Sequence, residues 1–332
     1  MKNVLVRYLS EADVRQLLDM PLALREVERA FAAHGRGEAV DTPRVRTRQP
    51  GAHLHVLQAA APELGLIGLK AYYVVPGKAS TSLIQLIDLA QGHLVALVEA
   101  DWLGRVRTGA ATGVAAARLA REDSRVAGFF GYGRQAVAQL EAVCAVRPLA
   151  EVKVHGRDTA AVRTFCDAMS ARLGVNVRPA ASPEETVRGS DIVVAMTRAS
   201  EPLFDGRWLE PGQFVAAAGG NSLDRREIDL ETVRRADLVV VDSREITERE
   251  CGDLLPAVEA GLLHWQRLAE LGEVVAGVRE GRRDAEQITL FESHGMGLQD
   301  VYTAAQVLAL AREHGLGTDL PMQAPVRSGA LD

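Results

Sequence analysis

The sequence has few cysteines and no long hydrophobic run. Its 332 residues include only Cys144, Cys166 and Cys251, which lie far apart in the chain. An odd number at such spacing argues against a disulfide framework and is typical of reduced thiols in a cytoplasmic protein. No segment approaches about 18 uninterrupted apolar residues, and charges interrupt residues 1–7. Neither a membrane span nor a signal peptide is therefore expected.

An excess of positive charge is also missing. The chain has 38 lysines and arginines against 44 acidic residues, a net charge of −6. Mild acidity argues against a nucleic acid or an anionic membrane as the partner. An anionic substrate must then be attracted by a local cluster of cations. The length predicts two domains, each able to bury a substantial core.

The first hundred residues predict an α+β domain. Ser10 with Asp13 three positions later resembles a capping box, and a second helix begins near Pro21 and continues to Gly35. Four extended segments with short turns then predict a largely antiparallel sheet, and an Ala-rich helix follows. The expected strands are 53–57, 67–75, 83–88 and 93–98, and the helix is 108–120.

After Arg125, apolar strands alternate with amphipathic helices, the pattern of a parallel sheet covered on both faces. The expected strands are 126–130, 152–155, 175–178, 192–197, 214–218 and 238–242. The predicted fold class is therefore α/β, a Rossmann-type doubly wound sheet at 114–293 plus an α+β domain formed by 1–113 with 294–332. The tail after His294 is expected to be helical, with no strand of its own.

Gly131-Tyr132-Gly133 lies between a buried strand and an amphipathic helix. The first glycine permits a tight turn, and the second lets the backbone approach a pyrophosphate. The helix that follows presents free N–H groups and the positive end of its dipole. This segment, with Arg134 and Gln135 at the helix start, predicts dinucleotide binding. A structural glycine turn without nucleotide is the alternative.

The end of the second strand of this domain bears on the choice of nucleotide. NAD-binding proteins usually place an acid there for the ribose hydroxyls. Here the strand ends in His155-Gly156 and is followed by Arg157, whose guanidinium suits a 2′-phosphate. We therefore expect NADP(H) to be preferred. Asp158 keeps NAD(H) possible, and a solvated Arg157 is the remaining alternative.

Several further motifs occur in a fixed order along the chain, and with them the sequence resembles the ornithine cyclodeaminase/μ-crystallin family over almost its full length. They are Thr42-Pro43-Arg44-Val45, Gly68-Leu69-Lys70, Arg107-Thr108-Gly109-Ala110-Ala111, Gly131-Tyr132-Gly133-Arg134-Gln135, Arg226-Glu227-Ile228-Asp229, Thr289-Leu290-Phe291-Glu292-Ser293 and Leu298-Gln299-Asp300.

The resemblance implies a nicotinamide cofactor, contacted also by Thr108, and a homodimer formed through the first domain. It also implies chemistry at the C–N bond of a small α-amino or α-imino acid. Family activities include cyclodeamination of ornithine or lysine, alanine dehydrogenation and reduction of cyclic ketimines. Some members are ligand-binding or lens proteins.

Arg44, Lys70 and Arg107 match the family's substrate-site cations. A guanidinium fixes a substrate carboxylate in a bidentate orientation, which places the α-carbon for hydride transfer. Lys70 lies in an apolar strand, where burial favours loss of its proton, so it is a candidate proton carrier for the substrate nitrogen. A surface charge or a structural ion pair is the alternative for each cation.

Two departures from the cyclodeaminase pattern matter. Cyclodeaminases have an aspartate base after the Gly219-Gly220 pair, where this chain has Asn221, which orients a substrate but takes no proton at neutral pH. They also have a glutamate, for the terminal amine of the substrate, near the position aligned with Val56. Loss of both acids argues against a diamine substrate. Asp224 is a substitute base only if it is not simply solvated.

His294 lies beside glycines near the expected cofactor cleft, and it is a candidate proton donor or a hydrogen-bonded hinge residue. The sequence has no cluster with metal-ligand spacing and no Ser–His–Asp arrangement, so we expect no metal. The leading hypothesis is an imine reductase or amino-acid dehydrogenase, with Lys70 and Asn221 at the reacting nitrogen. A cyclodeaminase with catalytic NAD and a nucleotide-dependent binding protein are the alternatives.

Overall fold

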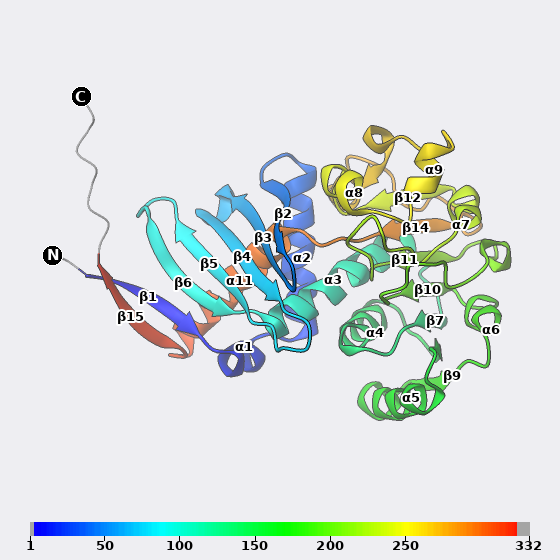
Figure 1. Cartoon of the computed structure of the whole chain (residues 1–332), viewed down its shortest axis with the longest axis horizontal. Coiled ribbons are helices and arrows are strands. Elements are labelled where there is room, and N and C mark those ends of the chain that lie inside the picture. Colours follow the sequence, from blue (N-terminus) through cyan, green and yellow to red (C-terminus); the bar gives the residue numbers. More distant parts are fainter. Residues whose placement is uncertain (1–2, 324–332) are drawn as a thin grey trace. The chain divides into compact units, whose positions relative to one another are not determined.

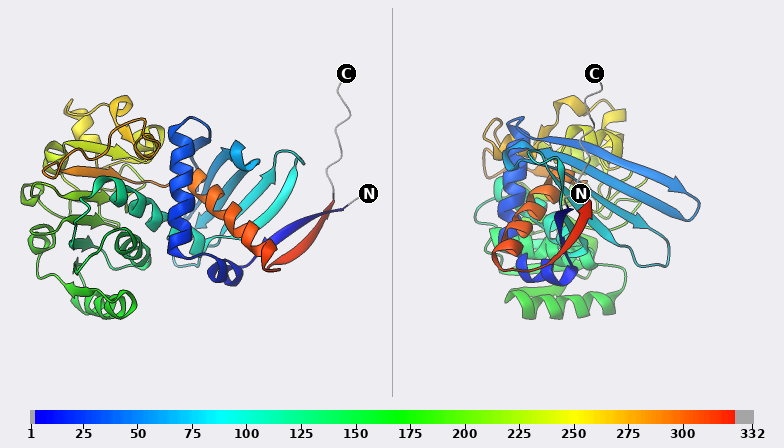
Figure 2. Two further views of the ribbon diagram at one scale, coloured as in Figure 1. Left: turned by 180° about the vertical axis from the view of Figure 1, so that it is seen from behind. Right: turned by 90° about the vertical axis from the view of Figure 1, so that its left-hand side faces the viewer.

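The computed structural model describes residues 3–323 (Figures 1 and 2). Contacts within the chain divide it into two compact units. The first unit comprises residues 3–19, 38–104 and 297–323, and the second comprises 20–37 and 105–296. Within the described residues, no helix is long and apolar enough to cross a membrane.

The first unit is built on a seven-stranded sheet in the order β15-β1-β6-β5-β4-β3-β2. β1 and β6 are parallel, and all other neighbours are antiparallel. The strands are β1 (Asn3–Leu9), β2 (Val40–Gln49), β3 (Ala52–Ala61), β4 (Leu66–Val74), β5 (Ser82–Asp88), β6 (His93–Glu99) and β15 (Thr318–Gln323). A 3₁₀ turn, η1 (Pro62–Leu64), joins β3 to β4.

One face of this sheet is covered by a helix, and the other is not covered within the described chain. Helix α11 (Gly297–Glu313) packs across β2 to β5. A Cβ added at Gly68 of β4 would lie 3.0 Å from Val301 of α11, so glycine allows this close approach. The short helix α1 (Glu11–Leu17) has the expected capping box between Ser10 and Asp13.

Apolar side chains lie on the face of the sheet that points away from α11. Because side chains alternate along a strand, Ile67 and Tyr73 of β4 point opposite to Gly68. The register places Leu54 opposite Tyr73 and Val45 opposite Val56. Val45, Leu54, Ile67 and Tyr73 are 55%, 42%, 40% and 41% exposed. We call these four residues the apolar face.

The second unit is an eight-stranded parallel sheet in the order β13-β12-β14-β11-β10-β7-β8-β9. The run β9-β8-β7-β10-β11 has the 3-2-1-4-5 order of dinucleotide-binding folds, with the switch between β7 and β10. The strands are β7 (Val126–Phe130), β8 (Glu151–His155), β9 (Asn176–Pro179), β10 (Ile192–Ala195), β11 (Phe214–Ala217), β12 (Leu238–Val241), β13 (Ala269–Glu270) and β14 (Thr289–Glu292).

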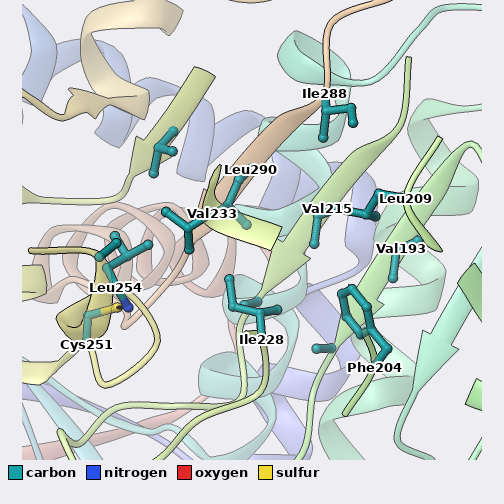
Figure 3. Close-up of a cluster of buried hydrophobic side chains, with 14 of the residues drawn as sticks. Val193, Phe204, Leu209, Val215, Ile228, Val233, Cys251, Leu254, Ile288 and Leu290 are labelled. Carbon is teal, nitrogen blue, oxygen red and sulfur yellow. Dashed lines mark hydrogen bonds between the residues drawn. The ribbon is translucent and has the colours of Figure 1, made fainter. Parts of the chain in front are cut away.

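Helices cover this sheet as the alternating pattern predicted. They are α2 (Met20–Gly35), α3 (Asp101–Leu119, mostly in this unit), α4 (Arg134–Val146), α5 (Thr159–Leu173), α6 (Pro183–Val187), α7 (Leu230–Arg235), α8 (Arg244–Glu250), α9 (Leu255–Glu259) and α10 (Leu271–Val275), with 3₁₀ turns η2 (Gly206–Trp208) and η3 (Trp265–Arg267). Figure 3 shows the apolar cluster on one side of the sheet, where Phe204, Ile228 and Leu254 cover Val193, Val215 and Leu290. The predicted fold class is confirmed.

The predicted boundaries differ from these units at residues 20–37, 105–113 and 294–296, which were expected with the first domain and belong to the second unit. Residues 20–37 were expected with the first domain, but α2 packs against α10 and α4 of the second unit. A Cβ added at Gly35 would lie 2.0 Å from the carbonyl oxygen of Gly272, so this contact requires glycine. The period of a helix predicts its apolar side but not the element that this side packs against.

The prediction that the tail has no strand is wrong, because β15 pairs antiparallel with β1. The segment Thr318–Gln323 has little strand character and contains Pro321. Proline is tolerated there because β15 is an edge strand that bonds on one side only. Residues 324–332 of the predicted domain lie outside the described residues.

Candidate active site

The turn from β7 into α4 has the geometry of a phosphate-binding loop. Gly131 has φ +111°, and a Cβ added there would lie 2.5 Å from the carbonyl oxygen of Met196, just after β10. Gly133 is the N-cap of α4, with no side-chain cap and open space around its Cα. The exposed first turn of α4 therefore offers backbone N–H groups to an anion at the switch point of the sheet. This arrangement fits a dinucleotide.

The aromatic residue of the loop, Tyr132, packs against the end of β8. The Tyr132 ring lies against Gly156, where an added Cβ would come within 2.2 Å of it. Gly156 thus makes room for Tyr132 at the end of β8. Arg157 follows and is exposed, whereas Asp158 caps α5 by accepting from the backbone N–H groups of Ala160 and Ala161 at 3.0 Å each.

The other predicted cofactor residues lie in the same unit. Arg134 is exposed at the start of α4, and Gln135 beside it has a buried Oε1 with no hydrogen-bond partner among residues 3–323. A dinucleotide is a natural source of the missing donor. The carbonyl of Thr108 in α3 accepts from Gln139 of α4 at 3.3 Å, and a Cβ added at Gly109 would lie 2.3 Å from the Ala138 carbonyl oxygen. Small residues therefore hold α3 tightly against α4.

Arg107 is buried, 6% exposed, against the segment that follows β14. A Cβ added at Gly295, where φ is +81°, would lie 2.8 Å from an Arg107 guanidinium nitrogen. Asp242, at the end of β12, accepts from the backbone N–H groups of His294 and Gly295 at 2.6 and 2.7 Å. One buried carboxylate thus fixes the turn on which the guanidinium rests.

His294 is brought next to the Gly219-Gly220-Asn221 loop. Its Nδ1 lies 3.1 Å from the Gly220 carbonyl oxygen. Because a carbonyl oxygen only accepts, Nδ1 carries the proton, and Nε2 is then an acceptor in the neutral ring. Asn221 is exposed at the end of this loop. Asp224 is exposed and accepts a hydrogen bond from the Ser222 hydroxyl.

Buried carboxyl groups hold the strand ends together in this unit. Glu227 accepts from Thr197 N–H and hydroxyl at 2.6 and 2.7 Å and from Gly219 N–H at 2.7 Å, which joins the ends of β10 and β11. Asp253 in turn accepts from the N–H groups of Glu227 and Ile228. Burial raises the pKa of Glu227 to about 7 and also raises the pKa of Asp253.

Glu292 is the most strongly perturbed of these acids. It is fully buried, and its pKa is raised well above the ordinary value, first by burial and then by the charges of Asp253 and Glu227. The Cys251 thiol donates to its Oε2 at 3.7 Å. Cys251, Glu292 and His294 bring three donor atoms within 4.8 Å of one another, a convergence that the sequence spacing did not reveal.

In the first unit, Lys70 lies in a buried ion pair. Its Nζ is 2.8 and 2.7 Å from the two carboxylate oxygens of Asp300 in α11. Lys70 is 4% exposed and Asp300 is fully buried. The carboxylate stabilises the charged ammonium and so opposes the loss of the proton that burial alone favours. The predicted proton carrier is thus held by a partner that the sequence did not indicate.

Arg44 and Lys70 both lie close to Tyr72. The Arg44 guanidinium donates to the Tyr72 hydroxyl at 3.3 Å, and Lys70 Nζ is 5.9 Å from the centre of the Tyr72 ring. The imidazole ring of His55, in β3, stacks on the Tyr72 ring. The two ring centres are 4.6 Å apart and the planes are parallel within 1°. The structure therefore brings Arg44 and Lys70 into one cluster with Tyr72, His55 and Asp300.

The alignment of Val56 with the cyclodeaminase glutamate places that residue on the wrong face. Val56 pairs with Val45 and Ala71, on the side of the sheet away from α11. His55 is on the face of Lys70 and Tyr72, so His55 occupies the position from which a side chain in this stretch reaches the cluster. The conclusion drawn from the missing acid is unchanged, because His55 is not an acid either.

Sequence reasoning missed four residues that build these clusters: Asp242, Asp300, Tyr72 and His55. Asp242 ends an apolar strand, a position that faces the ligand edge of a parallel sheet, and this signal was available. Asp300 belongs to the Leu298-Gln299-Asp300 motif, but its contact with Lys70 spans 230 positions. No local pattern identifies such a partner.

Comparisons with known proteins agree with the fold and the motifs. Residues 6–315 match the model of the ornithine cyclodeaminase/mu-crystallin family. The chain is 32% identical over 291 residues to a Delta(1)-pyrroline-2-carboxylate reductase from Bacillus cereus, covering 84% of this chain and 89% of that protein.

Two solved structures are similar over nearly their whole length. One is the Delta(1)-pyrroline-2-carboxylate reductase of Thermococcus litoralis in complex with NADH and L-proline, at 33% identity and a TM-score of 0.89, covering 95% of this chain and 100% of that chain. The other is an archaeal alanine dehydrogenase dimer with bound NAD, at 31% identity and a TM-score of 0.89, covering 96% and 99%. With its glycine loop, buried lysine and arginines in place, this chain belongs to the ornithine cyclodeaminase/mu-crystallin family.

Proposed function

We propose that this protein is an NAD(P)H-dependent oxidoreductase that acts on the C–N bond of α-imino or α-amino acids, as an imine reductase or amino-acid dehydrogenase. The observation that carries the proposal is the buried Lys70 ammonium, held by Asp300 and flanked by Arg44 through Tyr72. The glycine loop at Gly131 supports the cofactor, and the relatives with imino-acid and amino-acid activities support the reaction class.

The three cations would have different roles toward one substrate molecule. Arg44 and Arg107 bind the α-carboxylate, which fixes the α-carbon. Lys70 Nζ donates a proton to the imine nitrogen and so makes the imine carbon more electrophilic. When bound, the nicotinamide supplies the hydride that this carbon accepts. In the reverse direction Lys70 takes the proton back, and Asp300 holds Lys70 Nζ in place throughout.

Asn221 and His294 would orient the substrate and not act as bases. The Asn221 amide has no basic lone pair at neutral pH. The His294 ring is oriented by the contact of its Nδ1 with the Gly220 carbonyl oxygen. With Asn221 and His55 in place of two acids, the substrate site lacks the counter-charges that a diamine needs. This favours the reductase over the cyclodeaminase.

We infer that NADP(H) is preferred over NAD(H). Arg157 is exposed after β8, at the position that faces the adenine ribose in this fold. Asp158, the residue that kept NAD(H) possible, is engaged as the N-cap of α5. The test is Arg157→Ser, with Arg163→Ser on the exposed side of α5 as control. Arg157→Ser should weaken NADPH binding by about 10- to 100-fold and leave NADH nearly unchanged. An equal effect on both would overturn this inference.

We also propose a homodimer in the cytoplasm. The apolar face is an exposed sheet surface of the kind that a second subunit covers, and a similar archaeal protein is a dimer. All three cysteines are free, and burial raises the pKa of Cys144 and Cys166 to about 11, as suits inert reduced thiols. The net charge of −6 gives no support to a nucleic acid partner.

The proposed reaction is tested by following oxidation of NADPH and NADH with a panel of cyclic and linear imino acids. Lys70→Met should lower kcat by more than about 100-fold while the Kd of the cofactor stays unchanged, because only the proton carrier is lost. Ammonia release from ornithine or lysine without net change in the cofactor would identify a cyclodeaminase instead. Tight ligand binding without any turnover would identify a binding protein.

A further inference from the structure

Glu227 is a fully buried acid that joins the two loops following β10 and β11. Its Oε1 accepts from the N–H and the hydroxyl of Thr197, and its Oε2 accepts from the N–H of Gly219. Because β10 and β11 are parallel neighbours, both loops leave the sheet at its carboxyl edge, where a doubly wound fold binds its ligand. One carboxylate therefore holds two loops of the ligand edge, with one oxygen for each loop.

The first of these loops contacts the proposed nucleotide loop. A Cβ added at Gly131 would lie 2.5 Å from the Met196 carbonyl oxygen and 3.4 Å from the methyl group of Thr197. The Met196 N–H also donates to the carbonyl oxygen of Phe130, directly before Gly131, at 2.9 Å. The position of Thr197 thus affects where the β7–α4 turn lies, and Glu227 holds Thr197 through two donors.

The second loop, residues 219–221, ends in Asn221, which is proposed to orient the substrate. A Cβ added at Gly219 would lie 2.4 Å from backbone atoms of the first loop and 2.7 Å from Glu227 Oε1. Only a residue without a side chain lets the two loops meet at the carboxylate. The next carbonyl oxygen, that of Gly220, lies 3.1 Å from Nδ1 of His294. The bond from Gly219 to Glu227 therefore fixes the loop just before its contact with His294.

The backbone of Glu227 is itself held by a second buried acid. Asp253 accepts from the N–H groups of Glu227 and Ile228 at 2.5 and 2.8 Å, and it is only 2% exposed. Glu227 is thus anchored at its backbone while its side chain reaches both loops. It cannot follow a movement of one loop without loosening its hold on the other.

We propose that Glu227 is a positioning residue that holds the nucleotide loop and the 219–221 loop in one relative arrangement, so that bound cofactor and bound substrate meet in a reactive geometry. This role rests on the proposed function for the identity of the two ligands. Glu227 acts through Thr197 and Gly219 and contacts neither ligand. The role accounts for the Arg226-Glu227-Ile228-Asp229 motif, which has no other part in the proposed reaction.

The same motif supplies a matched control. Asp229 Oδ1 accepts from the N–H and the hydroxyl of Thr232 at 2.7 and 2.8 Å, and its Oδ2 accepts from the Gly206 N–H at 3.0 Å. These donors are of the same kind as those of Glu227, but they belong to α7 and η2, which lead into the amino ends of β12 and β11. In Glu227→Gln and in Asp229→Asn the amide has one accepting oxygen, so each variant loses one of two links at nearly constant volume.

Glu227→Gln should lower kcat for imine reduction about 10- to 100-fold and raise the Kd of NADPH about tenfold, because one of the two loops is released. Assays at pH 8 keep the native carboxyl group ionised, since burial raises its pKa to about 7. Asp229→Asn should change kcat and Kd by less than about threefold, although urea denaturation should show lower stability for both folded variants. Equal effects of the two variants on kcat and Kd would overturn the proposal, because Glu227 would then contribute only to stability.

Thr197→Val is a milder second variant. Valine keeps a methyl group near Gly131 and removes the hydroxyl, which donates to Glu227 and accepts from the Ala199 N–H. It should lower kcat about two- to fivefold, and it should have little further effect when combined with Glu227→Gln, because the two changes break the same link. An unchanged kcat in Thr197→Val, or fully multiplicative losses in the double variant, would contradict the proposal.

Hydrogen exchange measured by mass spectrometry separates failure of this proposal from failure of the proposed function. Peptides that contain Thr197 or Gly219 should exchange faster in Glu227→Gln than in the native protein and should be unchanged in Asp229→Asn. Faster exchange there together with a raised Kd of NADPH supports the positioning role even if no imine is reduced. Imine reduction that is unchanged in Glu227→Gln retains the proposed function and removes the positioning role.

Discussion

The Lys70–Asp300 pair shows how a charge is kept inside the first unit. Moving an ammonium out of water costs several kcal/mol, and only a close carboxylate in good geometry offsets it. Both oxygens of Asp300 lie within 2.8 Å of Nζ, and neither side chain is more than 5% exposed. The pair is therefore coupled: each charge is tolerable only while the other is present.

This coupling predicts a non-additive double-mutant cycle. Asp300→Asn leaves the ammonium without its counter-charge and should lower the free energy of unfolding by about 3 kcal/mol. Lys70→Met should have a similar effect through the stranded carboxylate. The double variant Lys70→Met with Asp300→Asn should lose much less than the sum, as measured by urea denaturation.

Activity gives the second measurement on the same variants. Asp300→Asn should also lower kcat, because the Lys70 side chain is no longer held in one position at the substrate nitrogen. The double variant regains stability but not activity. Additive losses of stability together with an unchanged kcat in Asp300→Asn would show that the two side chains are independent.

At the scale of single residues, the sequence singled out three cations but did not indicate what holds them. Lys70 stands out because a lysine inside an apolar strand is unusual. Asp300 does not stand out, because it lies in an amphipathic helix where an acid is ordinary. His55 was hidden by a one-residue ambiguity, and in a strand one residue decides the face of the sheet on which a side chain lies.

Among the elements, the β7–α4 turn is the one whose backbone geometry restricts the sequence most closely at the proposed cofactor site. The positive φ of Gly131 and its close approach to the Met196 carbonyl act together, so any side chain must both adopt a strained backbone and displace the end of β10. The glycine at position 174, which ends α5 with φ +67°, has the same backbone requirement but nothing within 4 Å of its added Cβ.

These two glycines form a matched pair for a test. Gly131→Ala should raise the Kd of the dinucleotide by more than about tenfold, because the loop must move away from the phosphates. Gly174→Ala should leave that Kd unchanged and cost only about 1 kcal/mol of stability. Fluorescence titration with NADPH and urea denaturation measure the two effects. Unchanged binding in Gly131→Ala would remove the loop from the cofactor site.

Elements with a complete local signal were predicted, and those that depend on distant partners were not. Strands β7 to β12 have apolar runs flanked by helices, and their order follows from the fold class. The residues of β14 were recognised as a motif. However, β14 inserts between β11 and β12 in the sheet, and hydrophobic periodicity does not predict which strands become neighbours. β15 exists only because β1 offers an open edge, and α2 joins the second unit only through its contact at Gly35.

Across the whole molecule, the buried acids of the second unit set a pH dependence of stability. Folding raises the pKa of Glu292 well above 4.5 and the pKa of Glu227 to about 7. The folded protein therefore keeps protons that the unfolded chain releases, and the stability contributed by these groups falls as the pH rises from about 4.5. The contribution of Glu227 is lost by about pH 7, and that of Glu292 continues to fall above it.

Glu292→Gln should reduce this pH dependence. The amide is a neutral isostere of the protonated acid, and its oxygen still accepts from the Cys251 thiol. We expect similar stability near pH 5 and a variant that is more stable than the native protein near pH 8, with the difference growing steadily between them. Glu245→Gln, an exposed surface acid, is the control and should not change the slope. Parallel curves for Glu292→Gln and the native protein would mean that Glu292 is ionised when folded.

The apolar face is the feature of the whole molecule that most needs a second chain. A sheet surface with Val45, Leu54, Ile67 and Tyr73 all at least 40% exposed is unfavourable in water, and covering it by a second copy would bury aromatic and aliphatic groups together. Ile67→Lys places a charge on this face. It should convert the dimer into a monomer in light scattering coupled to gel filtration, whereas the native protein should have twice the mass of one chain.

Leu262→Lys supplies the control, because Leu262 is similarly exposed, at 47%, but lies in the second unit. That variant should remain a dimer. A native protein with the mass of one chain would refute the dimer, and a dimeric Ile67→Lys would move the interface to another surface. Because Ile67 points away from Lys70 and Tyr72, the monomeric variant should also keep its cofactor affinity, which separates assembly from the binding site.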